Sequence, residues 1–182
     1  SSDLFEAHRY AQARSAVLAH MADLEGIGLA HEILGLSAYR LGRWQEAVRH
    51  LDLARELRPG DPSVAVVLAD CHRALGRHHE VERLWAEVRA ASPAPWILAE
   101  GRMTMAGSLA DRGELAAAIR TMTHGTRDPR RVREHHLREW YVLADLYDRA
   151  GEVATARRLY AKILGEDARF ADARERLGAL GG

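Results

Sequence analysis

The ten histidines of this sequence are the side chains that most directly suggest metal binding or proton transfer near neutral pH. Two pairs are adjacent along the chain, His78-His79 and His135-His136. Adjacent residues on a helix point about 100° apart, so neither pair directs both rings at one ion. A zinc-binding His-Glu-x-x-His motif is also absent, because Arg83 stands where the motif that begins at His79 needs its second histidine. We therefore predict no metal site and expect the histidines to face solvent or to lie near helix caps.

Nucleophilic catalysis and phosphate binding have equally little support in the sequence. No serine stands in the Gly-x-Ser-x-Gly pattern of a nucleophile elbow. The segment Gly26-Ile27-Gly28 matches neither the dinucleotide-binding motif nor the P-loop. Cys71 is the single cysteine, which excludes an internal disulfide framework and a multi-cysteine zinc or iron–sulfur site. We therefore predict a protein that is not an enzyme and that needs no cofactor.

A cluster of arginines over residues 127–138 is the clearest candidate for an anion-binding site. Its members are Arg127, Arg130, Arg131, Arg133 and Arg138. Acidic residues interleave with these arginines, and no aromatic side chain that would stack on a base precedes Trp140 in this segment. The pattern favours a solvated loop, and contact with an acidic partner or with RNA is the alternative.

Composition excludes several other classes of protein. The chain has 182 residues, of which 47% are hydrophobic, and 26 Lys and Arg balance 26 Asp and Glu. A net charge of zero provides no overall field that would attract nucleic acid or an anionic membrane. No apolar run approaches the roughly 20 residues of a membrane-spanning helix. The composition is typical of a globular protein.

A repeat of 34 residues organises the chain. This spacing separates Gly42 from Gly76 and Pro59 from Pro93. Apolar residues recur three and four positions apart on both sides of each glycine, which predicts two amphipathic helices in each repeat. The glycine ends the first helix, where a positive φ is needed, and the proline follows the second helix. Later copies of the glycine follow at longer spacings of 37 and 38 residues.

Small and large residues alternate in a way that predicts how the helices pack. Gly35, Ala69, Ala106 and Ala144 are small, and we expect two helix axes to cross closely at each of them. Bulky side chains are expected to fill the space against the neighbouring helix. They are Trp44, Leu51, Trp85, Met122 and Tyr160.

These spacings and residue types resemble tetratricopeptide repeats (TPRs), helix–turn–helix units of about 34 residues. The resemblance implies an all-α fold, a right-handed α-α superhelix (TPR solenoid) over residues 1–182. We expect about four helix pairs, an N-terminal half-repeat helix and a C-terminal capping helix. The expected parts are the N-terminal helix over 3–25, repeats over 28–61, 62–95, 96–130 and 134–168, of which the third is divergent, and the capping helix over 169–180.

Three shorter stretches resemble, more narrowly, stand-alone actinobacterial TPR proteins of unassigned function. They are residues 69–77, 99–102 and 134–138. This narrower resemblance implies an actinobacterial source and a cytoplasmic location. It implies no particular activity.

The resemblance also implies a partner-binding groove, because the first helix of each TPR pair lines the concave side of the array. We expect this groove to bind an extended peptide or a helix of another protein through apolar anchors and acidic rims. Ordinary packing between helices is the alternative for its apolar members. The expected groove residues are Leu29, Glu32, Leu36, Tyr39, Val66, Asp70, Arg73, Met103, Arg138, Tyr141, Asp145 and Asp148.

One TPR subtype binds a C-terminal carboxylate with a clamp of Lys, Arg and Asn. Glu32, Leu36 and Val67 stand at the corresponding positions here, so that clamp is missing. The sequence thus predicts a protein–protein interaction scaffold that does not use this mode of binding.

Three other roles are compatible with the pattern. The first is a regulatory or sensor domain of a larger transcription or signalling protein. The second is an RNA- or ribosome-associated module that uses the Arg127–Arg138 region, although the balanced charge makes nucleic acid the less favoured partner. The third is a homo-oligomer that stacks end to end, because truncated arrays expose an apolar end.

Overall fold

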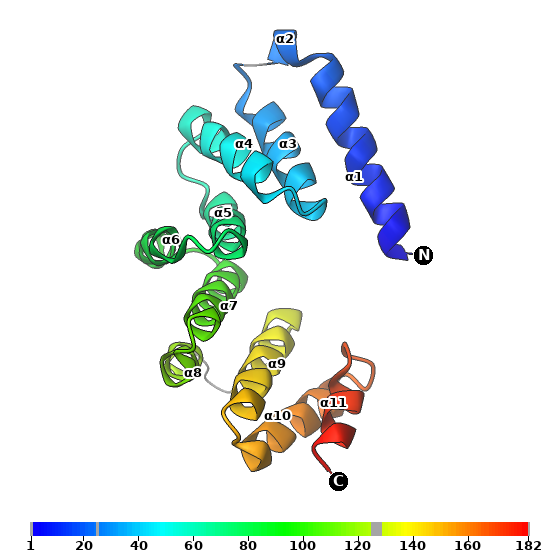
Figure 1. The fold of residues 1–182 in the computed structure, drawn as a ribbon, viewed down its shortest axis with the longest axis vertical. Coiled ribbons are helices and arrows are strands. Elements are labelled where there is room, and N and C mark those ends of the chain that lie inside the picture. The colour runs from blue at the N-terminus through cyan, green and yellow to red at the C-terminus, as the bar shows by residue number, and fades with distance from the viewer. Residues whose placement is uncertain (1, 25, 125–128, 182) are drawn as a thin grey trace. The chain divides into compact units, whose positions relative to one another are not determined.

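The computed structural model describes residues 2–24, 26–124 and 129–181, and all regular secondary structure within these ranges is helical. The chain divides into two compact units, Ser1–Pro93 (unit 1) and Ala94–Gly182 (unit 2). Each unit is built from pairs of helices joined by short turns (Figure 1). The all-α expectation is therefore confirmed, while the repeat boundaries remain predictions.

Unit 1 consists of an N-terminal helix followed by two helix pairs, α3 with α4 and α5 with α6. α1 packs against α3, and α4 also contacts α5 (Figure 1). Each of the four paired helices contributes a fully buried leucine: Leu34, Leu51, Leu68 and Leu84. Burial of such a side chain stabilises the fold by about 1.5–3 kcal/mol. The helices are α1 (Ser2–Ala19), α2 (Met21–Leu24), α3 (Gly28–Arg40), α4 (Trp44–Leu57), α5 (Pro62–Ala74) and α6 (His78–Ala91).

The turns within the pairs of unit 1 depend on glycine. Gly42 has a φ of +70° and Gly76 a φ of +69°, a region that side chains rarely adopt. The N–H of Arg43 donates to the carbonyl of Ala38 over 2.8 Å, and the N–H of Gly42 donates to that of Tyr39 over 3.0 Å. These two bonds form a Schellman motif, which satisfies the last carbonyl groups of α3. The predicted role of the repeated glycine is confirmed.

The crossing of α3 and α4 depends on the absence of a side chain at Gly35. A Cβ atom added there would lie 2.6 Å from Cγ of Leu51 and 3.1 Å from its backbone nitrogen. Real Cβ atoms rarely approach other atoms so closely, which confirms the predicted tight crossing at this position.

Unit 2 contains two further pairs, α7 with α8 and α9 with α10, and a final short helix that packs against α10. One core cluster centres on Met122 and Leu146, and a second on Trp140 and Tyr160. Ala144 is fully buried in the second cluster, as expected for a close crossing. The helices are α7 (Pro95–Asp111), α8 (Leu115–Thr123), α9 (Glu134–Arg149), α10 (Val153–Glu166) and α11 (Ala173–Ala179).

The bulky residues predicted to fill the space between helices differ in their burial. Leu51, Met122 and Tyr160 are fully buried, whereas Trp44 and Trp85 are only partly buried. In the described parts of the chain, no helix has both the length and the apolar character needed to cross a membrane.

Candidate functional site

The start of α3 carries an exposed apolar patch, formed by Ile27, Leu29 and Leu57. Leu29 is 52% exposed, and the other two members are also exposed. The patch lies where the start of α3 meets the end of α4, since a Cβ atom built at Gly28, between Ile27 and Leu29, would lie 2.7 Å from Cγ of Arg58 and 3.2 Å from Cβ of Leu57. Of these residues, sequence reasoning identified Leu29 alone, because Leu57 belongs to the second helix of the pair.

A charged pair borders this apolar patch. Nη1 of Arg58, the residue after α4, donates to Oε2 of Glu32 on α3 over 2.8 Å. Leu36 follows one turn later on α3 and is partly buried. The expected groove residues Leu29, Glu32 and Leu36 are therefore all accessible on one helix.

The remaining expected groove residues of unit 1 contact one another or the core. The hydroxyl of Tyr39 donates to Oδ2 of Asp70 on α5 over 2.8 Å. Burial raises the pKa of Tyr39, and the neighbouring carboxylate of Asp70 raises it further. Val66 is buried, so its side chain belongs to the packing between helices, and Arg73 is partly buried.

In unit 2, ion pairs join α7 and α9, and one of them involves the expected groove residue Arg138. Arg138 on α9 forms a two-pronged ion pair with Glu100 on α7, in which Nη2 lies 3.1 Å from Oε2. Arg102 and Glu139 form a second pair between the same helices, and the carboxylate of Glu139 is buried. Met103 is buried and contributes to the core.

The second half of α9 is bound by the C-terminal segment of the chain itself. The hydroxyl of Tyr141 donates to Asp172, the residue before α11. Arg176 on α11 forms an ion pair with Asp145 and lies 3.7 Å from Asp148. Three expected groove residues are thus brought together, with α11 as their partner in this structure.

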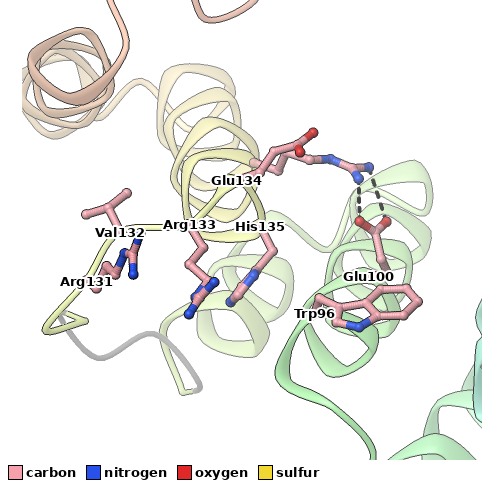
Figure 2. Close-up of a pocket in the computed structure, with 8 residues that line it drawn as sticks. Trp96, Glu100, Arg131, Val132, Arg133, Glu134 and His135 are labelled. Atoms are coloured by element: carbon pink, nitrogen blue, oxygen red, sulfur yellow. Dashed lines mark hydrogen bonds and ion pairs between the residues drawn. The ribbon is translucent and has the colours of Figure 1, made fainter.

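A pocket of about 490 Å³ in unit 2 was not predicted from the sequence (Figure 2). Trp96, on the first turn of α7, is 50% exposed and forms part of its wall. The repeat pattern could have indicated that Trp96 and Arg133 line one pocket, because they stand at the starts of successive first helices, α7 and α9. The residues that line the pocket are Trp96, Glu100, Arg131, Val132, Arg133, Glu134, His135 and Arg138.

The pocket changes the interpretation of the arginine cluster. Arg130, Arg131 and Arg133 are exposed, in agreement with the expectation of a solvated segment, and Arg127 lies outside the described residues. Within the segment itself no aromatic residue precedes Trp140. In the structure, Trp96 of α7, a whole repeat earlier in the chain, lines the same pocket as Arg131 and Arg133.

The histidines were expected to face solvent or to lie near helix caps. His31 and His72 do not face solvent, since both are buried, but each lies near an end of its helix: His31 is the fourth residue of α3, and His72 is in the last turn of α5. Nδ1 of His31 lies 3.0 Å from Nδ1 of His50, and the two rings stack with their centroids 5.3 Å apart. Burial lowers the pKa of His50 and of His72, which favours their neutral forms. Within the described residues, no group of three or more His, Cys, Asp or Glu side chains is arranged to hold a metal ion.

Cys71 is buried on α5 and does not face solvent. Burial raises the pKa of its thiol to about 12, and the carboxylate of Asp70 contributes to the shift. A thiol is a nucleophile only as a thiolate, so Cys71 stays unreactive at neutral pH.

Comparison with known proteins identifies the fold. No protein-family model and no curated protein matches the sequence. Among solved structures, the chain is similar to a thermophilic TPR protein of Thermus thermophilus, with a TM-score of 0.73 and 19% sequence identity. The match covers 97% of this chain and 93% of that one. The chain therefore has the TPR fold, a helical solenoid, as the sequence predicted.

Proposed function

We propose that this chain, which has the TPR fold, is a scaffold whose first helices bind a peptide segment or a surface of a partner protein. The observation that carries the proposal is the apolar patch of Ile27, Leu29 and Leu57 at the start of α3. An apolar centre with a charged border is the usual anatomy of a protein interface. The pair of Arg58 and Glu32 provides such a border.

Binding at this surface is an equilibrium process that involves no bond making or breaking. A partner that covers Leu29 and its neighbours removes apolar area from water, which contributes about 25 cal/mol per Å². A specific complex buries roughly 800 Å² on each partner. The apolar patch is smaller than that, so the partner also contacts the polar surfaces of the first helices in this proposal.

Affinity capture from the source cell, read by mass spectrometry, tests this function. The baits are the unaltered chain, the variant Leu29→Glu, and the matched control Val153→Glu. Val153 is 40% exposed on α10, a second helix of unit 2, so the control introduces the same charge on an apolar side chain away from the patch. Circular dichroism of all three baits verifies that the helical fold is intact.

The expected result is a set of proteins retained by the unaltered chain and by Val153→Glu, and reduced about tenfold or more by Leu29→Glu. Equal retention of these proteins by all three baits would place the binding surface elsewhere. A bait that retains no more protein than empty beads would argue against a protein-binding function.

A further inference from the structure

The pocket of unit 2 places an accessible aromatic ring at the start of α7. Ile97 and Ala99, which follow Trp96 on that helix, are buried, whereas the indole remains half exposed. A tryptophan contributes strongly to binding because it buries a large apolar area with little loss of conformational freedom. The half-exposed ring therefore offers an apolar contact to a molecule in the pocket.

The other side of the pocket is basic. Figure 2 shows Arg133 and His135 extending in the same direction from the start of α9, with Trp96 across the pocket from them. Arg138 is already paired with Glu100. Throughout the described parts of the chain, no ion pair is formed by Arg131 or Arg133.

We propose that this pocket binds an acidic segment of a partner protein. Side-chain carboxylates of that segment pair with Arg131 and Arg133, and an adjacent apolar or aromatic side chain packs against Trp96. The planar guanidinium group suits a carboxylate because it donates two parallel hydrogen bonds to it. The inference rests on the proposed function, that the chain binds proteins, and it adds the chemistry of one partner.

The pocket suits an acidic peptide better than a nucleic acid. Glu100 and Glu134 interrupt its basic wall, so the pocket offers its arginines to one or two carboxylates but forms no continuous basic track for a chain of phosphates. Proteins that bind single-stranded nucleic acid combine a basic groove with several aromatic platforms. Here a single indole lines the pocket, whereas a short peptide needs only one or two carboxylates and one apolar side chain.

The volume of the pocket is consistent with this size of ligand. About 490 Å³ lies within the range of roughly 300–1,000 Å³ that is typical of binding pockets. The pocket lined by Trp96 and the arginines is therefore large enough for a few side chains of a bound segment.

Selection from a random peptide library displayed on phage tests the proposal, with the whole chain as the target. We expect the selected peptides to be enriched in Asp and Glu next to Phe, Trp or Leu. Three variants are then compared with the unaltered chain for binding of these peptides. They are Trp96→Ala, the charge reversal R131E with R133E, and the control R158E with R169E.

The control reverses the same number of charges on exposed arginines of unit 2 that do not line the pocket. We expect the pocket reversal to weaken binding of the acidic peptides at least about thirtyfold, and Trp96→Ala to weaken it about tenfold. The control should change it less than about threefold. Peptides whose acidic residues are replaced by Lys and Arg should bind the R131E, R133E variant better than the unaltered chain.

Three results would overturn the inference, and the first of them separates its failure from a failure of the proposed function. Peptides that are selected but bind equally well to the pocket variants would support protein binding and place it at another surface. A random single-stranded RNA library provides the second comparison. Retention of RNA by the unaltered chain, lost with R131E and R133E while no acidic peptide is selected, would assign the pocket to nucleic acid. Failure to select any peptide would also contradict the proposal.

Discussion

The hydroxyl of Tyr39 on α3 donates a hydrogen bond to Oδ2 of Asp70 on α5, 2.8 Å away. A second tyrosine makes the same contact in unit 2, where Tyr141 on α9 donates to Asp172, just before α11. In both contacts the aspartate follows the tyrosine by 31 residues. Each bond links the first helix of a pair to the element that follows that pair, α5 in unit 1 and the segment before α11 in unit 2. The stability of a repeat array depends on such interfaces between neighbouring elements.

The substitution Tyr39→Phe should lower the free energy of unfolding by about 1–2 kcal/mol. It removes a hydrogen bond to a charged acceptor and leaves the ring packing in place. Unfolding by urea, followed by circular dichroism, measures the change. Tyr147→Phe is the control, because the hydroxyl of Tyr147 forms no hydrogen bond with the described residues, and it should change stability by less than about 0.5 kcal/mol. Equal effects of the two substitutions would mean that the bond to Asp70 contributes nothing.

Gly35→Ala should destabilise the protein by about 1–3 kcal/mol, because the new methyl group would overlap Leu51. The matched control is Gly165→Ala on α10, where a Cβ atom meets nothing within 4 Å. There the alanine should stabilise the helix by about 0.5–1 kcal/mol. Thermal unfolding of both variants measures whether each substitution lowers or raises the stability of the protein. A Gly35→Ala protein as stable as the unaltered one would argue against the close crossing of α3 and α4.

Unit 1 should lose stability on mild acidification because of His50. Burial lowers the pKa of His50, and His31 and Arg49 lower it further. Of the other charged neighbours, Glu46 raises this pKa and Arg14 lowers it. The unfolded chain therefore binds the proton more readily than the folded one. The free energy of unfolding is highest above the unfolded pKa of about 6.5 and decreases as the pH falls through the lower pKa of the folded state.

Urea unfolding at about pH 7.5 and about pH 5.5 measures this loss, and we expect it to be smaller in His50→Gln than in the unaltered protein. The His50→Gln variant should still lose some stability on acidification, because burial also lowers the pKa of His72. The control is His79→Gln, since the side chain of His79 is 99% exposed. A loss on acidification that is the same in all three proteins would show that His50 does not contribute.

Arg176→Ala should release α11 from α9. The guanidinium group holds Asp145 and Asp148 on α9, and its loss leaves both carboxylates without this partner. Hydrogen exchange of residues 173–179 should accelerate about tenfold or more, while exchange in α7 stays unchanged. Arg174→Ala, on the same helix, removes only a bond of 3.3 Å to the carbonyl of Ala168 and should leave exchange nearly unaltered. Undiminished protection of α11 in Arg176→Ala would show that apolar packing alone holds it.

The helix pairs were predictable because the interactions that define them are local. A glycine at the end of a first helix, such as Gly42, closes a hydrogen-bonded motif within six residues. Apolar residues three and four positions apart define the buried face of each helix. The resemblance to TPRs followed from these patterns, and the structural similarity to a solved TPR protein confirms the fold.

The exposed surface was much harder to predict, because helical periodicity does not distinguish a groove residue from one that packs on the next helix. Val66 and Met103 were expected to face a groove and are buried. Tyr141 and Asp145 were expected to face a partner and contact the chain's own C-terminal segment. The buried histidines were missed because an imidazole suits either environment, depending on its neighbours.

The helices, their pairing and the small residues at their crossings follow from the sequence alone, since each depends on residues close together in the chain. Which side chains of different repeats meet is instead a property of the tertiary fold. Trp96 and Arg133 are 37 residues apart and line one pocket because their helices start at the same end of neighbouring pairs. That contact depends on the packing of whole helices against each other, which no local pattern specifies.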